Sequence, residues 1–190
     1  MYFLIAGCVL FFGTHLYTSV RTRDPARDIR VRLGPAKYMA IYSVFAGLGF
    51  VLMVWGYGLA RPSPTLYTPP TWGAHINLAL MLPALILVFA AYAPLGYVKN
   101  AVKHPMVLGV ILWSFGHLLA NGELNSVILF GSFLAYALID RILVMGRPVK
   151  IPAKPPSLFA DIYAVCVGAA VYFLFYKYLH AMMIGVPVIA

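Results

Sequence analysis

The sequence is poor in charge, and above all in acidic residues. Charged residues make up 10% of its 190 positions and hydrophobic residues 63%, whereas soluble domains carry roughly 25% charged residues. This scarcity excludes a soluble globular domain and predicts an integral membrane protein. Lysine and arginine outnumber aspartate and glutamate by 14 to 5. Because the basic residues cluster in loops between apolar segments, nucleic acid is disfavoured as a partner and the lipid bilayer is expected.

Cysteine is scarce as well. Cys8 and Cys166 lie inside apolar segments, and neither belongs to a CxxC or CxxCH motif. Disulfide staples, zinc fingers and covalently attached c-type haem are therefore disfavoured. The sequence also lacks an internal repeat, so an inverted-repeat transporter has no support. The first apolar run has neither a basic leader nor an A-x-A-like cleavage site, and we expect a retained helix rather than a signal peptide.

Long apolar segments fill most of the chain. They predict an all-α fold, a polytopic membrane bundle of six transmembrane helices that forms a single domain over residues 1–190. The predicted helices cover residues 1–20, 37–60, 72–94, 106–120, 124–145 and 157–184. The fourth is shorter than the ~20 residues that a straight span needs, so we expect it to include residues 103–105 and Asn121 as well.

The loops between these segments alternate in charge. The loops after the first, third and fifth helices are basic, at residues 21–37, 99–103 and 147–154. The loops after the second and fourth helices each hold a single charged residue, Arg61 and Glu123. By the positive-inside rule, the basic loops are cytoplasmic and both termini lie on the opposite side of the membrane.

Polar residues at helical spacing mark the fourth and fifth helices. Ser114, His117 and Asn121 are three and four residues apart and share one face. The fifth helix carries a similar stripe of Asn125, Ser132, Tyr136 and Asp140. Joined by a tight turn at Asn121 and Gly122, the two helices predict a buried polar site. An imidazole inside a membrane is costly without a partner, so His117 is a functional candidate.

Five histidines invite a metal or haem hypothesis. His75, His104 and His180 lie near segment ends, where structural roles are favoured; His75 and His104 remain less favoured metal ligands. His15 and His117 lie deeper, and either metal ligation or an interhelical hydrogen bond is open to them. His15 lies ~20 Å from the outer end of its helix and His117 only ~6 Å from the outer turn. Depth alone would pair His117 with His75, or His15 with His104.

The histidines of the fourth segment cannot share one iron if its helix is continuous. His104 and His117 are thirteen residues apart, which corresponds to ~20 Å along the helix axis. The acidic residues Asp140 and Asp161 lie near the basic loops, close to Arg141. For them we expect an ion-pair network at the helix ends, with a proton relay as the alternative.

With these residues in view, the chain resembles the NnrU family. The resemblance covers residues 1–147 most distinctively and lies in the opening GTH, in RLGPAKYMAIYSV and in WGYGLARPSPTLYTPPTW. Its longest part is KHPMVLGVILWSFGHLLANGELNSVILFGSFLAYALIDR, residues 103–141. The family is associated with bacterial denitrification and linked to the expression or activity of nitrite and nitric oxide reductases. The resemblance therefore implies a bacterial inner-membrane protein with periplasmic termini and the nitrogen-oxide reductase machinery as a partner.

The family is also similar to zeta-carotene isomerase, a membrane enzyme of plants and cyanobacteria with histidine-ligated haem b. Its first-helix histidine falls on His15, and the two histidines of its HP…GH segment fall on His104 and His117. This likeness implies His15 and His117 as ligands of haem b. The isomerase has a cysteine, implicated in a redox ligand switch, three residues before its GH histidine. Ser114 stands at that position here, a departure that puts isomerase activity in doubt.

Two functions of different classes are therefore expected. One is an accessory or regulatory role in nitrogen-oxide respiration, with His15 and His117 sensing or carrying haem. The alternative is a haem b-dependent isomerase of a lipid-soluble substrate, for which aromatic residues such as Trp113, Phe115 and Phe130 would line an apolar pocket. Whether the protein is an enzyme thus stays open on the sequence. A transporter is a third, weaker hypothesis.

Overall fold

The structure, a computed structural model, describes residues 1–146 and 155–188. Within these ranges the chain is helical, apart from an isolated antiparallel bridge between Thr65 and Glu123, and the predicted all-α class is confirmed. The elements are α1 Tyr2–Val20, α2 Ile29–Leu33, α3 Pro35–Leu59, α4 Gly73–Tyr92, α5 Tyr97–Val102, α6 Pro105–Ala120, α7 Leu124–Met145, α8 Leu158–Leu174, the π-helix η1 Phe175–Leu179 and α9 His180–Ile184. The predicted basic loop residues Arg147, Lys150 and Lys154 lie outside the described ranges.

Five helices in the described ranges are long and apolar enough to cross a membrane: α1, α3, α4, α7 and the continuous run Leu158–Ile184. The apolar helix α6 has only 16 residues. The expectation that it includes residues 103, 104 and 121 is wrong. Lys103 has a φ of 61° and ends α5, His104 is the N-cap of α6, and Asn121 is already extended.

Proline fixes the start of two of these helices. Pro35 is the first residue of α3, after Gly34 with a φ of 81°. Pro105 is likewise the first residue of α6. The first helical position needs no N–H donor, and the ring of proline presets a helical φ there.

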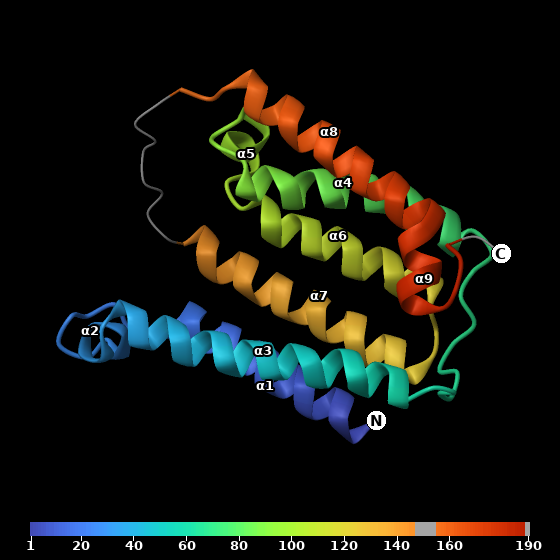
Figure 1. Cartoon of the computed structure of the whole chain (residues 1–190), viewed down its shortest axis with the longest axis horizontal. Coiled ribbons are helices and arrows are strands. Elements are labelled where there is room, and N and C mark those ends of the chain that lie inside the picture. Colours follow the sequence, from blue (N-terminus) through green and yellow to red (C-terminus); the bar gives the residue numbers. More distant parts are fainter. Residues whose placement is uncertain (147–154, 189–190) are drawn as a thin grey trace. The chain divides into compact units, whose positions relative to one another are not determined.

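The described residues group into two compact units, one of residues 1–66 and 123–145, the other of residues 67–122 with the described part of 146–190. The assignment of residues 1–190 to a single domain stays a prediction. In the first unit α1 packs against α3 and α7 (Figure 1). In the second, α4 packs against both α6 and α8 (Figure 1).

Glycine lets α1 and α3 approach closely. A Cβ at Gly49 would lie 2.6 Å from the backbone nitrogen of Phe11, and one at Gly56 would meet the backbone of Leu4. On α1, a Cβ at Gly7 would meet the backbone of Met53. Small residues at these positions bring the two helix backbones into van der Waals contact, the main source of helix association in a membrane.

Replacing Gly49 with alanine is expected to destabilise the first unit by about 1–3 kcal/mol, because the added methyl group overpacks a contact with backbone that cannot yield. Gly47 on the same helix has open space where a methyl group would stand, with no atom within 4 Å, so Gly47→Ala is the matched control. Thermal unfolding of the detergent-purified protein checks the difference. Equal melting temperatures for the two variants would contradict the close packing.

In the second unit, α6 runs antiparallel to α4 along most of its length. A Cβ at Gly109 would lie 2.8 Å from the carbonyl oxygen of Ala84, and one at Gly116 would lie 2.5 Å from the side-chain oxygen of Asn77. At the end of this contact, a Cβ at Gly73 would meet the carbonyl group of Leu119. The short helix α6 therefore spans the greater part of the long helix α4.

Contacts near the ends of helices agree with helices that alternate in direction. In the first unit, Ser19 near the end of α1 donates to Asp140 near the end of α7 at 2.6 Å. In the second unit, the N–H of Ser157 donates to the carbonyl of Leu95 at 2.9 Å, so the start of α8 lies beside the end of α4. These pairs join chain segments that the charge pattern places on one side of the membrane.

Candidate functional site

His15 lies in the last two turns of α1 and is partly buried. Its Nδ1–H donates to the carbonyl oxygen of Phe11, one turn earlier, at 2.7 Å. A neutral imidazole that donates through Nδ1 keeps a lone pair on Nε2. Backbone carbonyls commonly hold metal-binding histidines in this way, so the local geometry of His15 suits a ligand.

Aromatic rings from three helices surround the His15 ring. Phe11 on α1 lies with its ring centroid 4.1 Å away, tilted by 33°. Tyr42 on α3 and Tyr136 on α7 meet the imidazole edge-on, at 5.3 Å and 5.8 Å. Tyr136 was predicted as part of a polar stripe, but the contact of Tyr42 with His15 was not. The structure thus places His15 where α1, α3 and α7 of the first unit meet.

His117 repeats the arrangement of His15 in the second unit. It lies in the last turn of α6, where its Nδ1–H donates to the carbonyl oxygen of Trp113 at 2.8 Å. The rings of Trp113 and His117 lie 5.1 Å apart. Both deeper histidines are therefore oriented by the carbonyl of an aromatic residue four residues earlier, and the ring of that residue packs against the imidazole.

The other members of the α6 stripe also bond within their own helix. The hydroxyl of Ser114, which is fully buried, donates to the carbonyl of Val110 at 2.6 Å. The side-chain amide of Asn121 donates to the carbonyl of His117 at 2.9 Å. Serine hydroxyls in membrane helices commonly bond to the carbonyl one turn back. Ser114 and His117 share a face of α6 as their spacing predicts, whereas Asn121 follows the end of the helix and donates back to it.

The less favoured histidines lie at helix ends, as predicted. His75 is exposed in the first turn of α4, and His104 is the N-cap of α6. His104 and His117 therefore lie at opposite ends of one continuous helix, the condition under which the sequence predicts that they cannot share an iron.

Two polar residues of α7 bond to α1 and α3. The hydroxyls of Ser126 and Tyr57 lie 3.0 Å apart, and Asp140 accepts from Ser19 at 2.6 Å. Ser126 and Asp140 are buried. Sequence reasoning missed Ser19 and Tyr57 because it did not indicate which helices are neighbours in space.

In the described part of the chain, hydroxyl and backbone N–H groups donate to Asp140 and Asp161, and the expected ion-pair network around them stays a prediction. Asp161 accepts from the backbone N–H groups of Tyr97 and Val98, at 2.8 Å and 3.2 Å. It thereby satisfies free donors in the first turn of α5. Asp140 is held by Ser19, as described above.

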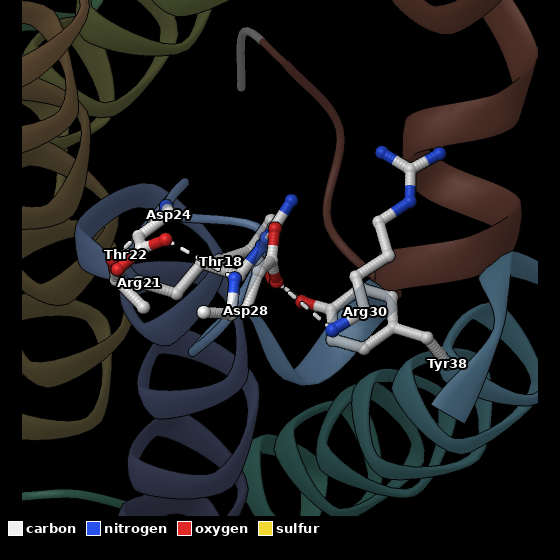
Figure 2. A network of polar contacts seen from close by, with 8 residues as sticks. Thr18, Arg21, Thr22, Asp24, Asp28, Arg30 and Tyr38 are labelled. Carbon is white, nitrogen blue, oxygen red and sulfur yellow. Dashed lines mark hydrogen bonds and ion pairs between the residues drawn. The ribbon is translucent and has the colours of Figure 1, made fainter. Parts of the chain in front are cut away.

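A buried ion pair lies in the first basic loop (Figure 2). Arg21 donates to Asp28, and their side chains are only 4% and 8% exposed. Asp28 also accepts from the N–H of Arg30 at 2.9 Å and so caps α2. The hydrogen bond from Arg21, assisted by that from Arg30, holds the pKa of the Asp28 carboxyl below its usual value. Arg21 also lies over the ring of Tyr38, 5.3 Å from its centroid.

Haem is a cofactor that single imidazoles such as those of His15 and His117 could hold. Among the described residues, no group of three or more histidine, cysteine, aspartate or glutamate side chains could hold a metal ion. A porphyrin supplies four nitrogens itself and needs one or two protein ligands. Single imidazoles with oriented rings, as at His15 and His117, meet that requirement.

The helices and these residues define a multi-pass membrane protein with oriented histidines inside its apolar helices. The chain belongs to the NnrU family, since a family model described as NnrU protein matches residues 3–188. The match extends beyond residue 147, where the most distinctive motifs end, and includes the C-terminal helices. No curated protein and no solved structure matches the chain.

Proposed function

We propose that the chain is a bacterial inner-membrane protein with an accessory or regulatory role in denitrification, acting on the expression or activity of nitrite and nitric oxide reductases. The observation that carries this proposal is the family match over residues 3–188. The proposed protein partner is the reductase machinery. The lipid bilayer is the proposed surroundings of the chain itself.

In this proposal α6 is a sixth transmembrane helix. Its 16 residues correspond to ~24 Å, somewhat less than the ~30 Å of a hydrocarbon core. Its antiparallel contact with α4, from Gly73 to Ala84, supports a crossing despite this length. Local thinning of the bilayer accommodates a short helix at modest cost. With six crossings, both termini lie on the periplasmic side, opposite the basic loops.

We further propose that His15 and His117 are ligands of a b-type haem. Support comes from the bond that each Nδ1–H makes to a carbonyl four residues earlier, which leaves Nε2 as the ligating atom. The chain's own groups then orient the imidazoles, while the aromatic rings of Phe11 and Trp113 pack against them. When bound, the haem would supply an iron centre for redox or gas sensing.

The isomerase alternative gains no support from Ser114. Its hydroxyl is fully buried and bonds to the carbonyls of Val110 and Ile111, and it lacks the soft sulfur that a redox ligand switch would use. The accessory role is therefore favoured over isomerisation of a lipid-soluble substrate.

Deleting the gene is expected to lower nitrite and nitric oxide consumption by cells growing anaerobically on nitrate. Reductase transcripts and protein levels, measured in parallel, separate an effect on expression from one on activity. A plasmid copy of the full chain should restore both rates, and the empty plasmid is the matched control. Unchanged consumption after deletion would refute the accessory role.

A further inference from the structure

A groove opens in the first unit between α1, α2 and α3, with a cavity of about 430 Å³. This volume is within the range of small-molecule sites, roughly 300–1,000 Å³. One wall comes from α1, with Val9, Gly13 and Tyr17, and the other from α3, with Ile41 and Phe45. All of the groove's lining residues belong to α1, α2 and α3, so it is complete within this unit.

The walls of the groove are mainly hydrocarbon. The hydroxyl of Thr14 donates to the carbonyl of Leu10 at 2.7 Å, and that of Thr18 contacts the carbonyl of Thr14 at 3.2 Å. The hydroxyl of Tyr38 lies 3.0 Å from that of Thr18. With these three hydroxyls engaged, the lining offers an occupant mainly methyl, aliphatic and aromatic surface, beside the hydroxyls of Tyr17 and Tyr42. In a membrane protein such walls suit a hydrocarbon chain.

The short helix α2 adds charge at one end of the groove. Ile29 and Leu33, four residues apart, line the groove from one edge of α2. At 100° per residue, Arg30 and Arg32 flank this apolar edge on its two sides. Both are exposed, and in the described part of the chain neither forms an ion pair. Figure 2 shows the guanidinium group of Arg30 extending away from the carboxylate of Asp28. The contact between these two residues is the hydrogen bond that the backbone N–H of Arg30 donates to that carboxylate.

The surrounding loop leaves an excess of unpaired positive charge. Residues 21–37 contain six basic and two acidic residues. The two carboxylates are engaged by Arg21 and Arg27, at Asp28 and Asp24 respectively. Among the described contacts this leaves four of the six basic side chains without a carboxylate partner. An anion at this end of the groove would therefore meet cations that no acidic residue neutralises.

We propose that the groove binds one anionic glycerophospholipid. An acyl chain lies between α1 and α3, and the headgroup phosphate is held by Arg30 and Arg32. Guanidinium groups bind phosphate oxygens through paired, charge-assisted hydrogen bonds. The hydrocarbon walls and the basic rim thus match the two halves of one lipid molecule. No histidine lines this site, although Tyr42 borders both the groove and His15, and the proposal does not rest on the proposed role in denitrification.

Lipid binding to the purified full-length protein tests the proposal. Delipidated protein is mixed with phosphatidylglycerol or with phosphatidylcholine of the same acyl chains, and bound lipid is counted by native mass spectrometry. Two arginines near the phosphate are expected to give roughly 30-fold tighter binding of phosphatidylglycerol. The double variant Arg30→Gln/Arg32→Gln should lose this preference, and Arg30→Lys/Arg32→Lys should keep most of it.

A second variant tests the groove itself. Gly13 lines the groove and has open space at its Cβ position, so Gly13→Phe should fill it and abolish tight binding without a clash. Gly47→Phe, at an equally open position outside the groove lining, is the control and should bind as the wild type does. Equal affinity for the two lipids, or a preference that survives both Gly13→Phe and the glutamine variant, would overturn the proposal. So would a neutral lipid-soluble compound that copurifies in the groove and resists exchange with phosphatidylglycerol.

Discussion

Loss of the b-type haem spectrum is the expected result of replacing His15 or His117 with alanine. Each imidazole is fixed through its Nδ1–H, at 2.7 Å from Phe11 and 2.8 Å from Trp113, with Nε2 as the ligating nitrogen. Mutating outer-shell partners of a metal site typically costs roughly 10- to 100-fold in affinity. Loss of a ligand itself is expected to lower haem occupancy by more than that.

Absorption spectra of the detergent-purified protein, oxidised and dithionite-reduced, measure this loss. His75→Ala is the matched control, because His75 is an exposed imidazole in the first turn of α4. Added imidazole should restore part of the spectrum of His15→Ala if the variant retains its fold. Wild-type protein without haem, even after expression with added haem, would remove the haem proposal. Loss of the spectrum in only one of the two variants would contradict the proposal that both histidines are ligands.

The sequence predicted the long helices well because a run of about twenty predominantly apolar residues is typical of a transmembrane helix and of few other structures. The bounds of α7, Leu124–Met145, match the predicted segment. The fourth segment was extended wrongly, since a span of typical length was assumed. Lys103, with its positive φ, and Pro105 separate α5 from α6, and a proline at the first helical position could have indicated this boundary.

The short helix α2 in the first basic loop was missed. Five residues are too few for hydrophobic periodicity to be recognised, and α2 is held by its surroundings. Its signals were present in the sequence, namely Asp28 as an N-cap and Gly34 followed by Pro35 as a stop. They are easily taken for loop residues because the arginines dominate the pattern.

The environment of His15 shows where sequence reasoning ends. Spacing along a helix predicted that Ser114 and His117 share a face, because the helical period fixes that relation. It could not predict that Tyr42 and Tyr136 pack against His15. Those contacts depend on which helices are neighbours, and apolar surfaces of similar composition do not specify this. Close glycine contacts such as Gly49 with Phe11 settle the pairing of α1 with α3.

Replacing Asp28 with asparagine is expected to cause the largest stability loss of any single charge removal in the loop of residues 21–37. Arg21 is 4% exposed and depends on Asp28 for its counter-charge. Its Nε has no hydrogen-bond partner among the described residues, so the guanidinium would be left buried and largely uncompensated. Asp24→Asn is the control, because Asp24 lies 3.9 Å from Arg27 in an exposed pair, and such pairs contribute little.

The two variants should also differ in their response to acid. The pKa of Asp28 is lowered in the folded protein, so its contribution is complete above the unfolded value of about 3.9. The contribution is lost as the pH falls through the lower, folded pKa. Thermal unfolding between neutral pH and about pH 3 should therefore show an acid-dependent loss in the wild type and in Asp24→Asn. Asp28→Asn should lack that component.

A double variant separates the ion pair from simple loss of packing. Arg21→Met/Asp28→Leu removes both charges, so no uncompensated cation remains, and it is expected to be more stable than Asp28→Asn alone. Because Asp28 also caps α2 through the N–H of Arg30, the double variant should still fall short of the wild type. If it were less stable than Asp28→Asn, packing of the two side chains would outweigh their charges. The side chains of Arg21 and Asp28 would then stabilise the loop chiefly through van der Waals packing, including the contact of Arg21 with the ring of Tyr38.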